Sequence, residues 1–573
     1  MGRKAFATVV ASVLIPGSLP AFSYHLASSA HFLRTVLSLP ERADESFAAD
    51  LRISTCPPGS CATVYARHFN GETWWNYVKV LADDKMEGRE TGSRGEQAAQ
   101  DYAIDQLKRN GVSPAGMVGF LQPMNFVSRQ IVEKDCSLTV VTGDKREPLT
   151  LGEDAIIMTR ALPAPEVNAG LVFVGYGLKV PEKDYDDFRD LDVKGKLVVT
   201  VSGLPPGIPG PLASHYRSLR ERWKTLKSLG AIGIVSIPNP ASMDIPWSRI
   251  TLNRTHPSMD LDYPEFNETQ GAALFLFVNP ARAEKLFVKS GHTFEEIIRL
   301  GKNHKRLPRF SLRASLEAKT RVETAKIQSA NVVGKLPGSD PALKDEYVVV
   351  SAHLDHLGMG EPVNGDRIYN GAMDNASGSA LLLDLAASLK DNSEKLRRSV
   401  LFVLFTAEEK GLLGSKFFTA HPTVAARSMV ADINVDMFLP IVPLKVLTVY
   451  GLSESDLGDS AQQVAAAVSV PVQPDPEPQR DVFIRSDQYN FILHGIPSLM
   501  MDVGYKPGSP QRAVFKEWLT HRYHAPSDDL NQPVDLAAAA KYEEIVRGLL
   551  IKIANADSRP QWKPKSFFRR YAQ

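Results

Sequence analysis

Residues 347–355, Tyr-Val-Val-Val-Ser-Ala-His-Leu-Asp, join a continuous apolar run to two side chains that can bind or position a metal. Residues 399–405 and 431–435 form similar runs, which lead into Glu408-Glu409 and into Asp436. Runs of β-branched and aromatic residues are typical of strands buried on both faces of a parallel sheet. Helical stretches at 377–389 and 411–419 alternate with these runs. This order predicts an α/β fold built on a doubly wound, mostly parallel sheet.

Five potential metal ligands lie beside these strands and loops, in the order His353, Asp374, Glu409, Asp436 and His524. In doubly wound sheets ligands bind beyond the carboxyl ends of the strands, so we expect the five side chains to meet at one sheet edge. Two imidazoles and three carboxylates suit zinc, and one shared carboxylate would give each of two ions about four partners once water is counted. Asp374 is the natural bridge because glycines on both sides let the backbone approach the ions closely.

Two further carboxylates have expected roles in catalysis. Glu408 adjoins a ligand, and because neighbouring side chains diverge, it can face the attacking water and act as general base and then as general acid. Asp355 follows His353 by two residues and is placed to accept the second imidazole N–H, which would fix the tautomer. A single His or Asp is more often a cap, an ion-pair partner or a surface group, but five in this order favour a metal site. The other histidines of this region, His356, His421, His494 and His521, lack such placement and are interpreted as ordinary.

Six short motifs together resemble metallopeptidase family 28, which contains the bacterial leucyl aminopeptidases and glutamate carboxypeptidase. They are His353-Leu-Asp-His-Leu-Gly, Gly371-Ala-Met-Asp-Asn-Ala-Ser-Gly, Ala407-Glu-Glu-Lys-Gly-Leu-Leu-Gly-Ser, Asn434-Val-Asp-Met, Arg485-Ser-Asp and Tyr523-His-Ala-Pro-Ser-Asp. The resemblance covers about residues 330–555. It implies a phosphorylase/hydrolase-like zinc exopeptidase fold.

The resemblance also assigns roles to individual residues. It implies that His353 and Asp436 hold one zinc ion, that Glu409 and His524 hold the other, and that Asp374 bridges them. Glu408 would be the proton shuttle, and Tyr523 would donate a hydrogen bond to the tetrahedral oxyanion. A cis peptide between Asp374 and Asn375 is implied as well. Met373 departs from the family pattern, which often has a second acidic residue there, and we expect only a local effect.

The length of 573 residues predicts more than one domain. We expect residues 65–163 to form the first part of the peptidase domain and residues 319–560 to form the zinc peptidase core. Between residues 164 and 318 the chain contains Gly170-Leu-Val-Phe-Val-Gly-Tyr-Gly, Val193-Lys-Gly-Lys-Leu-Val-Val-Thr-Val and Ala231-Ile-Gly-Ile-Val-Ser-Ile. On these motifs, residues 164–318 resemble an inserted, β-rich protease-associated domain, whose role is either a passive lid or direct contact with substrate.

Composition and the N-terminus bear on partners and location. The formal net charge of +1 shows no excess of positive charge of the kind that binds nucleic acid, so we expect no nucleic-acid partner. Arg3 and Lys4 precede an apolar run to Ile15, which predicts a signal peptide over residues 1–23 and a periplasmic or secreted protein without a stable membrane anchor. Cys56 and Cys61 could close a small disulfide after export, leaving Cys136 unpaired.

The sequence thus predicts an exported dizinc exopeptidase that hydrolyses peptides, with an aminopeptidase favoured by family analogy. The alternatives are a carboxypeptidase of the glutamate carboxypeptidase type, a glutaminyl cyclase-like acyl transferase, and a non-catalytic binding homologue similar to the transferrin receptor. The complete set of ligands and base argues against the last. Neither a side-chain preference nor an oligomeric state is predicted.

Overall fold

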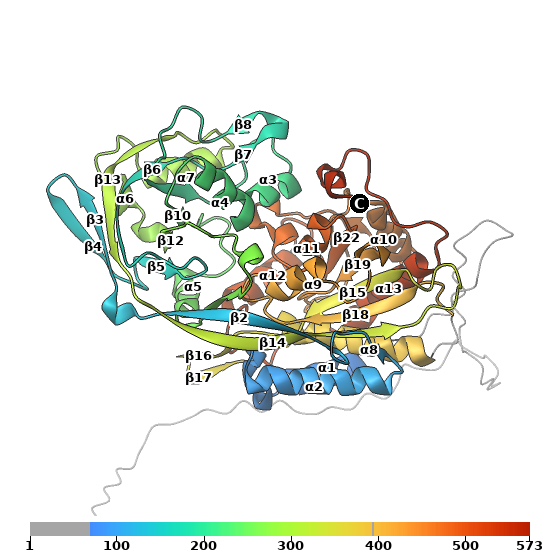
Figure 1. Ribbon diagram of the computed structural model, residues 1–573. Coiled ribbons are helices and arrows are strands. Elements are labelled where there is room, and N and C mark those ends of the chain that lie inside the picture. The colour runs from blue at the N-terminus through green and yellow to red at the C-terminus, as the bar shows by residue number, and fades with distance from the viewer. Residues whose placement is uncertain (1–68, 392–394, 573) are drawn as a thin grey trace, which may run out of the picture. The chain divides into compact units, whose positions relative to one another are not determined.

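The computed structural model describes residues 69–391 and 395–572, and two large sheets organise this part of the chain (Figure 1). The expected signal peptide and the Cys56–Cys61 pair lie outside the described residues. Within the described residues no helix combines the length and the apolar character that a membrane span needs.

The larger sheet has ten strands in the order β11-β2-β14-β18-β15-β19-β22-β20-β21, with β1 paired to β14. The strands are β1 (Ser113–Pro114), β2 (Leu121–Ile131), β11 (Ser258–Leu261), β14 (Val322–Leu336), β15 (Tyr347–His353), β18 (Ser399–Phe405), β19 (Met429–Asn434), β20 (Leu447–Tyr450), β21 (Val472–Gln473) and β22 (Ser498–Val503). The four central strands β18, β15, β19 and β22 are parallel, whereas β2 and β14 pair antiparallel with their neighbours. β20 pairs antiparallel with β22 and parallel with β21. The predicted α/β class is confirmed, with a parallel centre inside a mixed sheet.

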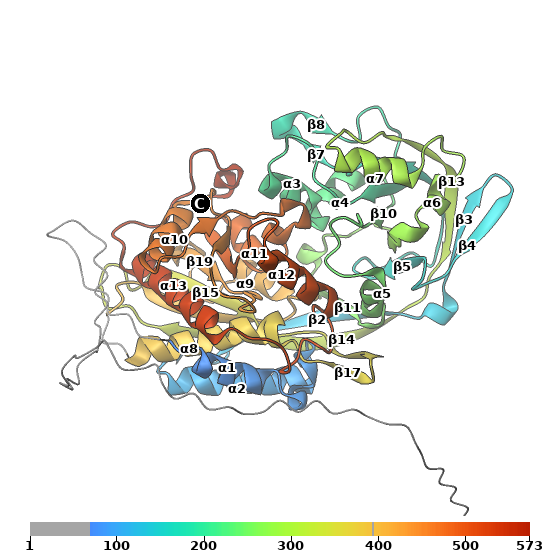
Figure 2. The same ribbon diagram turned by 180° about the vertical axis from the view of Figure 1, so that it is seen from behind.

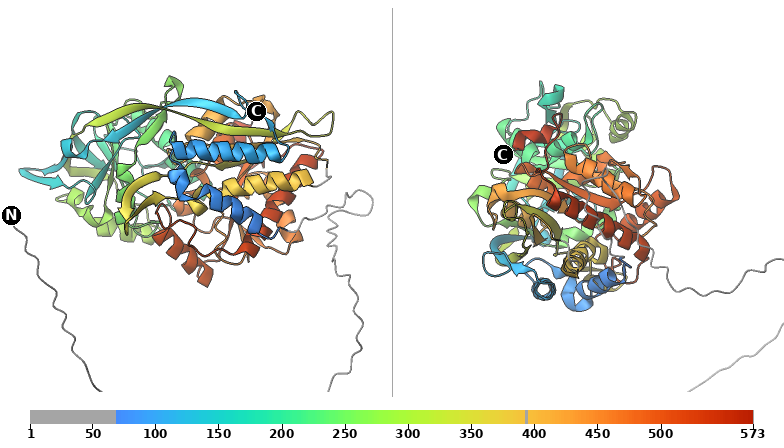
Figure 3. Two further views of the ribbon diagram at one scale, coloured as in Figure 1. Left: turned by 90° about the horizontal axis from the view of Figure 1, so that it is seen from below. Right: turned by 90° about the vertical axis from the view of Figure 1, so that its right-hand side faces the viewer.

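Helices cover both faces of this sheet, as the residue pattern of the central strands requires. In β15, Val348 and Val350 pack into one core and Val349 into the core on the opposite face. The first face carries α1 (Glu72–Leu81), α2 (Arg94–Arg109), α8 (Ser377–Asp391), α10 (Asp456–Ala467) and α13 (Leu536–Asn555). Figure 3 shows α1, α2 and α8 lying side by side on it. The second face carries α9 (Leu413–Ala420) and α11 (Gln488–Leu493), whose Phe418 and Phe491 pack together.

The smaller sheet has eight strands in the order β4-β3-β13-β6-β9-β10-β12-β5. They are β3 (Ser137–Thr142), β4 (Lys145–Leu149), β5 (Ala155–Met158), β6 (Glu166–Phe173), β9 (Leu197–Val201), β10 (Gly233–Ile237), β12 (Leu274–Val278) and β13 (Phe310–Lys319). Residues 137–158 therefore join this sheet, ahead of the boundary expected at residue 164. The reason is pairing: β3 hydrogen-bonds along β13, and β5 along β12.

Short helices flank the smaller sheet: α3 (Gly210–Arg217), α4 (Leu219–Ser228), α5 (Trp247–Ile250), α6 (Glu284–Phe287) and α7 (Phe294–Lys302). The remaining helix, α12 (Pro510–His521), packs into the core of the larger sheet. Two hairpins complete the elements, β7 (Lys179–Val180) with β8 (Tyr185–Asp186) and β16 (Gly358–Val363) with β17 (Asp366–Tyr369). For brevity, residues 137–319 are called the insert below.

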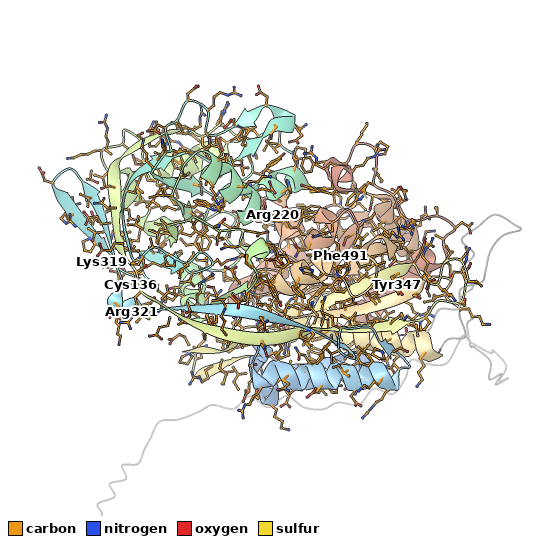
Figure 4. The ribbon with its side chains drawn as sticks, in the orientation of Figure 1. Cys136, Arg220, Lys319, Arg321, Tyr347 and Phe491 are labelled. Atoms are coloured by element: carbon orange, nitrogen blue, oxygen red, sulfur yellow. The ribbon has the colours of Figure 1, made fainter. Side chains whose placement is uncertain are left out.

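Two long strands connect the insert to the larger sheet. β2 pairs with β14 over eleven residues, from Leu121 to Ile131 (Figures 1 and 2). Along the chain, β2 leads into β3 of the smaller sheet, and β13 of the smaller sheet leads into β14. At this passage Cys136 lies beside Arg321, which Figure 4 labels, and its thiol accepts a hydrogen bond from the Arg321 amide at 3.2 Å. The short strand β11 comes from the insert but pairs with β2 at the edge of the larger sheet. The larger sheet therefore contains strands from before, within and after the insert.

Candidate metal centre

The parallel strands of the larger sheet bring the candidate ligands to one edge. His353 is the last residue of β15, Asp436 follows β19 by two residues, and the Glu408-Glu409 pair follows β18. Asp374 lies in the turn before α8, and His524 lies three residues after α12. Three backbone positions here are left-handed without glycine: Ala407 (φ 55°), Met437 (φ 47°) and His524 (φ 54°). Such positions cost free energy and cluster at functional sites, so these loops are built for side-chain placement.

All five predicted ligands meet as two groups that share one carboxylate. The Nε2 of His353 lies 3.3 Å from Asp374 Oδ1 and 3.2 Å from Asp436 Oδ1. The Nε2 of His524 lies 3.2 Å from Asp374 Oδ2 and 3.4 Å from Glu409 Oε2. Each oxygen of Asp374 thus faces a different imidazole, which is the arrangement that a bridging carboxylate needs.

The loop that presents Asp374 is held by hydrogen bonds from its backbone amides to Asp528. The peptide between Asp374 and Asn375 is cis, as the resemblance implied. Asp528 accepts hydrogen bonds from the amides of Met373 at 2.9 Å and Asp374 at 3.0 Å. A Cβ atom on Gly371 (φ 59°) would lie 2.1 Å from the Asp374 carbonyl oxygen, so only glycine fits there. Glycine thus permits a close approach within this loop, and the approach of the backbone to metal ions stays a prediction.

A buried arginine holds the same loop from the other side. Arg89 is fully buried and donates to the carbonyl oxygens of Leu354, Asn370 and Gly371 at 2.7 to 2.9 Å, and to that of Leu81 at 2.6 Å. Burial lowers the pKa of Arg89 to about 10, although nearby carboxylates, Asp528 first, oppose the shift. Nothing in the local sequence around Arg89 marks this role, because three of its four partners lie in two distant segments, at 354 and at 370–371.

Glu408 lies on the His353 side of the site, with its Oε2 3.9 Å from His353 Nε2. Burial raises the pKa of Glu408 well above its usual range, and Asp436 and Glu409 raise it further while His353 opposes them. Its backbone amide donates a hydrogen bond to Asp355 Oδ1 at 3.0 Å. This bond holds the main chain from which the side chains of Glu408 and Glu409 project.

Asp355 has a different role from the one expected. The Nδ1–H of His353 donates to the backbone carbonyl of Asp355 at 3.0 Å, whereas the carboxylate oxygen lies 3.8 Å away, beyond hydrogen-bond range. The carboxylate instead accepts from the amides of Glu408 and Glu409, at 3.0 and 3.4 Å, and from the Thr91 hydroxyl at 3.2 Å. The tautomer of His353 is fixed by main chain, and Asp355 orients the Glu pair.

Tyr523 and Glu408 line the same cavity. The Tyr523 ring lies against His524, with centroids 3.9 Å apart, and its phenol oxygen accepts a hydrogen bond from Arg485 Nη2 at 2.9 Å. Burial raises the pKa of Tyr523 above its usual range, against the opposing effect of Arg485. The phenol therefore keeps its proton and can donate it in a hydrogen bond.

His356 was interpreted as an ordinary histidine, and the structure places it in the site. Its side chain is fully buried, and Nδ1 lies 2.7 Å from Glu409 Oε1, the oxygen that points away from His524. His356, Asp374 and Glu409 also form a group with metal-ligand spacing. The signal available in the sequence was its position three residues after a predicted ligand, which is too weak by itself to single it out.

The residues present fit a divalent metal. Burial lowers the pKa of His353, but Glu408 and Asp436 outweigh it and hold the pKa well above its usual range, and Glu409 does the same for His524. Carboxylates that hold a proton on an imidazole favour a metal ion in its place, because metal binding displaces such protons. The buried atom Glu409 Oε1 and both ring nitrogens of His356 lack a well-formed hydrogen bond. Nitrogen and oxygen donors in this number suit zinc.

The cavity beside this site is lined by apolar and charged side chains. Met437, Leu439, Met500, Phe515 and Leu519 contribute apolar surface. Besides Glu408, the charged side chains outside the ligand set are Asp244, Arg480, Arg485 and Asp502. Burial raises the pKa of Asp502 well above its usual range, and its Oδ1 has no hydrogen-bond partner. An apolar cavity with a few convergent polar groups is the usual form of a ligand site.

Comparison with known proteins identifies the same region. Residues 331–550 match the model described as Peptidase family M28. Among curated proteins, the chain is 27% identical over 183 residues to "probable leucine aminopeptidase 2" of Aspergillus oryzae, covering 29% of this chain and 32% of the relative. It is 28% identical over 150 residues to "Carboxypeptidase Q" of Rattus norvegicus, covering 26% of this chain and 29% of the relative. The matches span about a third or less of the length of these relatives.

A solved structure extends the likeness to most of the fold. The aminopeptidase from Aneurinibacillus sp. strain AM-1 superposes with a TM-score of 0.51 at 18% identity, over 85% of this chain and 94% of that one. The likeness therefore includes the insert as well as the peptidase sheet.

Proposed function

Because residues 331–550 belong to peptidase family M28, we propose that this protein is an exported dizinc metalloexopeptidase that releases residues from the N-termini of peptides. One observation carries the proposal. The two oxygens of Asp374 face two separate imidazoles, those of His353 and His524, at 3.3 and 3.2 Å, and Glu408 stands beside the first.

The five side chains divide naturally between two ions. His353 and Asp436 would hold one zinc ion, Glu409 and His524 the other, and Asp374 both. Zinc bound there would polarise the carbonyl of the scissile peptide bond. Glu408 binds neither ion in this assignment, so it is free to move protons.

Glu408 and Tyr523 supply the proton transfer and the hydrogen bond that hydrolysis needs. Glu408 takes a proton from the attacking water and returns it to the leaving amine, so it acts first as base and then as acid. Its backbone is held by Asp355, which keeps the carboxylate in one place during both steps. Tyr523 donates a hydrogen bond from its phenol to the carbonyl oxygen as negative charge develops there.

The charged residues of the cavity support an aminopeptidase over a carboxypeptidase. A carboxypeptidase needs a cation that is free to bind the terminal carboxylate. Arg480 and Arg485 both line the cavity, but each already donates to Asp244, and Arg485 also donates to Tyr523. The oxygen of Asp502 that has no partner would accept a hydrogen bond from an amino group instead, and the positive charge of a bound ammonium would favour the ionised carboxylate. Names among the relatives include both activities, so the cavity is the more specific argument.

A panel of dipeptides tests this function directly. Purified, zinc-loaded protein is offered the same dipeptide with free ends, with a blocked N-terminus and with a blocked C-terminus. We expect cleavage of the free and the C-blocked forms and no cleavage of the N-blocked form. Cleavage of the N-blocked form without cleavage of the C-blocked form would establish a carboxypeptidase, and cyclisation of an N-terminal glutamine would establish an acyl transferase.

Export is a separate part of the proposal, supported by the charged and apolar pattern of residues 1–23. N-terminal sequencing of protein recovered outside the cytoplasm should begin after the apolar run that ends at Ile15. Full-length protein confined to the cytoplasm would contradict export and leave the peptidase assignment unaffected.

A further inference from the structure

The insert reaches the catalytic tyrosine through Asp244, which lies in the loop between β10 and α5. Its Oδ1 accepts a hydrogen bond from Arg480 Nε at 2.6 Å, and its Oδ2 accepts one from Arg485 Nη1 at 2.7 Å. Only 12% of the Asp244 side chain is exposed. Burial raises the pKa of Asp244, but Arg485 and Arg480 outweigh it and hold the pKa below its usual range. A largely buried, ionised residue of the insert is therefore paired with two arginines of the peptidase domain.

Arg485 connects Asp244 to Tyr523 through two hydrogen bonds. While Nη1 is bound to Asp244, Nη2 donates to the phenol oxygen of Tyr523 at 2.9 Å. A guanidinium group is planar and rigid, so fixing one edge on Asp244 fixes the direction of the other edge. An N–H that occupies a lone pair of the phenol oxygen leaves the phenol proton free to point elsewhere. Asp244 thereby restricts where Tyr523 can donate.

A second residue of the insert holds the backbone of the same tyrosine. Arg249, in α5, donates to the carbonyl oxygen of Tyr523 at 2.7 Å and to that of His521 at 3.2 Å. These bonds lie next to His524, whose left-handed backbone is costly to hold. Both the side chain and the main chain of Tyr523 are therefore fixed from the insert.

We propose that Asp244 and Arg249 are positioning residues for Tyr523, so that the insert is a working part of the peptidase site rather than a passive lid. The inference rests on the proposed function, since Tyr523 acts in hydrolysis. It names residues of the insert that act through Arg485 and through the loop 521–524. Two other roles are possible for the same contacts, a purely structural strut and a substrate-binding charge, and each gives a different kinetic result.

Steady-state kinetics of Asp244→Asn test the inference. The variant keeps the size of the side chain and removes its charge, so Arg485 loses a charge-assisted partner while the fold is kept. We expect kcat to fall roughly 10-fold with KM changed less than about 3-fold, because a displaced oxyanion donor acts mainly in the transition state. Zinc content and melting temperature should remain those of the wild type. A change confined to KM would show that Asp244 contributes a charge that binds substrate. Unchanged kcat and KM would show that Asp244 has a purely structural role. Either result overturns the proposal.

The double variant Asp244→Asn/Tyr523→Phe isolates the route. We expect Tyr523→Phe to lower kcat by roughly 10- to 10³-fold, and adding Asp244→Asn should then lower it no further, because the group being positioned is already gone. If the two substitutions instead lower kcat by independent factors that multiply in the double variant, Asp244 does not act through Tyr523 and the proposal is overturned. Glu182→Gln is the matched control, since it breaks another insert-to-core ion pair, 2.7 Å to Arg570, and should leave kcat unchanged.

Hydrogen exchange separates this inference from the proposed function. Arg249→Met removes the two bonds to the loop 521–524, and amide exchange in that loop should speed up, whereas Glu182→Gln should not change it. If the wild type cleaves no peptide, the proposed function fails, and exchange still reports on positioning. Unchanged exchange in Arg249→Met would overturn the role of Arg249 whatever the activity.

Discussion

Glu96 is a buried carboxylate whose titration should make the protein less stable as pH rises. It lies in the first turn of α2 and is 1% exposed. It accepts hydrogen bonds from the Gly92 amide at 2.6 Å, from the Ser329 hydroxyl at 2.7 Å and from the Thr406 hydroxyl. Burial raises its pKa from 4.5 to about 8; Asp355 adds to the shift, and the three hydrogen bonds oppose it.

The sign and size of the effect follow from this pKa. Between pH 4.5 and about 8 the folded protein keeps a proton that the unfolded chain releases, so the free energy of unfolding falls as pH rises. Each unit of pKa difference is worth about 1.4 kcal/mol. From about pH 5 to about pH 8 the two pKa values give a loss of about 3.5 kcal/mol.

Urea unfolding of the wild type and of Glu96→Gln measures this loss. Glutamine replaces the protonated acid at little cost near pH 5 and avoids the buried charge near pH 8. The variant should therefore gain about 3.5 kcal/mol relative to the wild type across this range. Glu72→Gln, an exposed glutamate in the first turn of α1, is the control and should show no such trend. A relative change below about 1 kcal/mol would refute the reasoning, because it would mean that Glu96 titrates alike in both states.

Three other predictions concern the metal and the junction with the insert. Chelation should abolish peptidase activity and Zn²⁺ or Co²⁺ should restore it; active protein without metal by elemental analysis would exclude the mechanism. Glu408→Gln should keep its metal and lose activity by roughly 10²- to 10⁴-fold, whereas Glu409→Gln should lose metal; equal metal loss in both would show that the pair is wrongly assigned. His215, in α3, lies 2.8 Å from the Tyr489 hydroxyl, and burial lowers its pKa from 6.5 to about 4. Since the unfolded chain binds the proton first, stability should fall as pH drops from 6.5 to about 4, by up to about 3 kcal/mol, and His215→Gln should remove this dependence in acid urea titrations.

The central strands and the proximity of the five candidate ligands could be predicted from the sequence because both signals are local. A strand buried on both faces needs an unbroken apolar run, as in β15 and β18, and a ligand at its carboxyl end follows that run directly. The positions of Asp374 and His524 needed the ordered set of motifs as well. All five side chains meet as expected.

The contributions that were missed depend on contacts between distant segments. His356 matters only because Glu409, far along the chain, turns one oxygen toward it. Asp355 was assigned to the wrong partner, because spacing cannot distinguish a backbone carbonyl from a carboxylate. Asp244 gave no signal, since its two arginines come from another domain. The extent of the smaller sheet was misjudged for the same reason, as β3 is recognisable only through its pairing with β13.

The strand β11 has a consequence for anyone who would cut this protein into parts. It supplies four residues of the insert, Ser258–Leu261, as the outermost strand of the peptidase sheet. Removing the insert would strip the hydrogen-bonding edge of β2 over residues Phe126–Arg129. An uncovered strand of this length is a template for association with other chains. An isolated peptidase core should therefore aggregate unless the bare edge is given a charge or a proline.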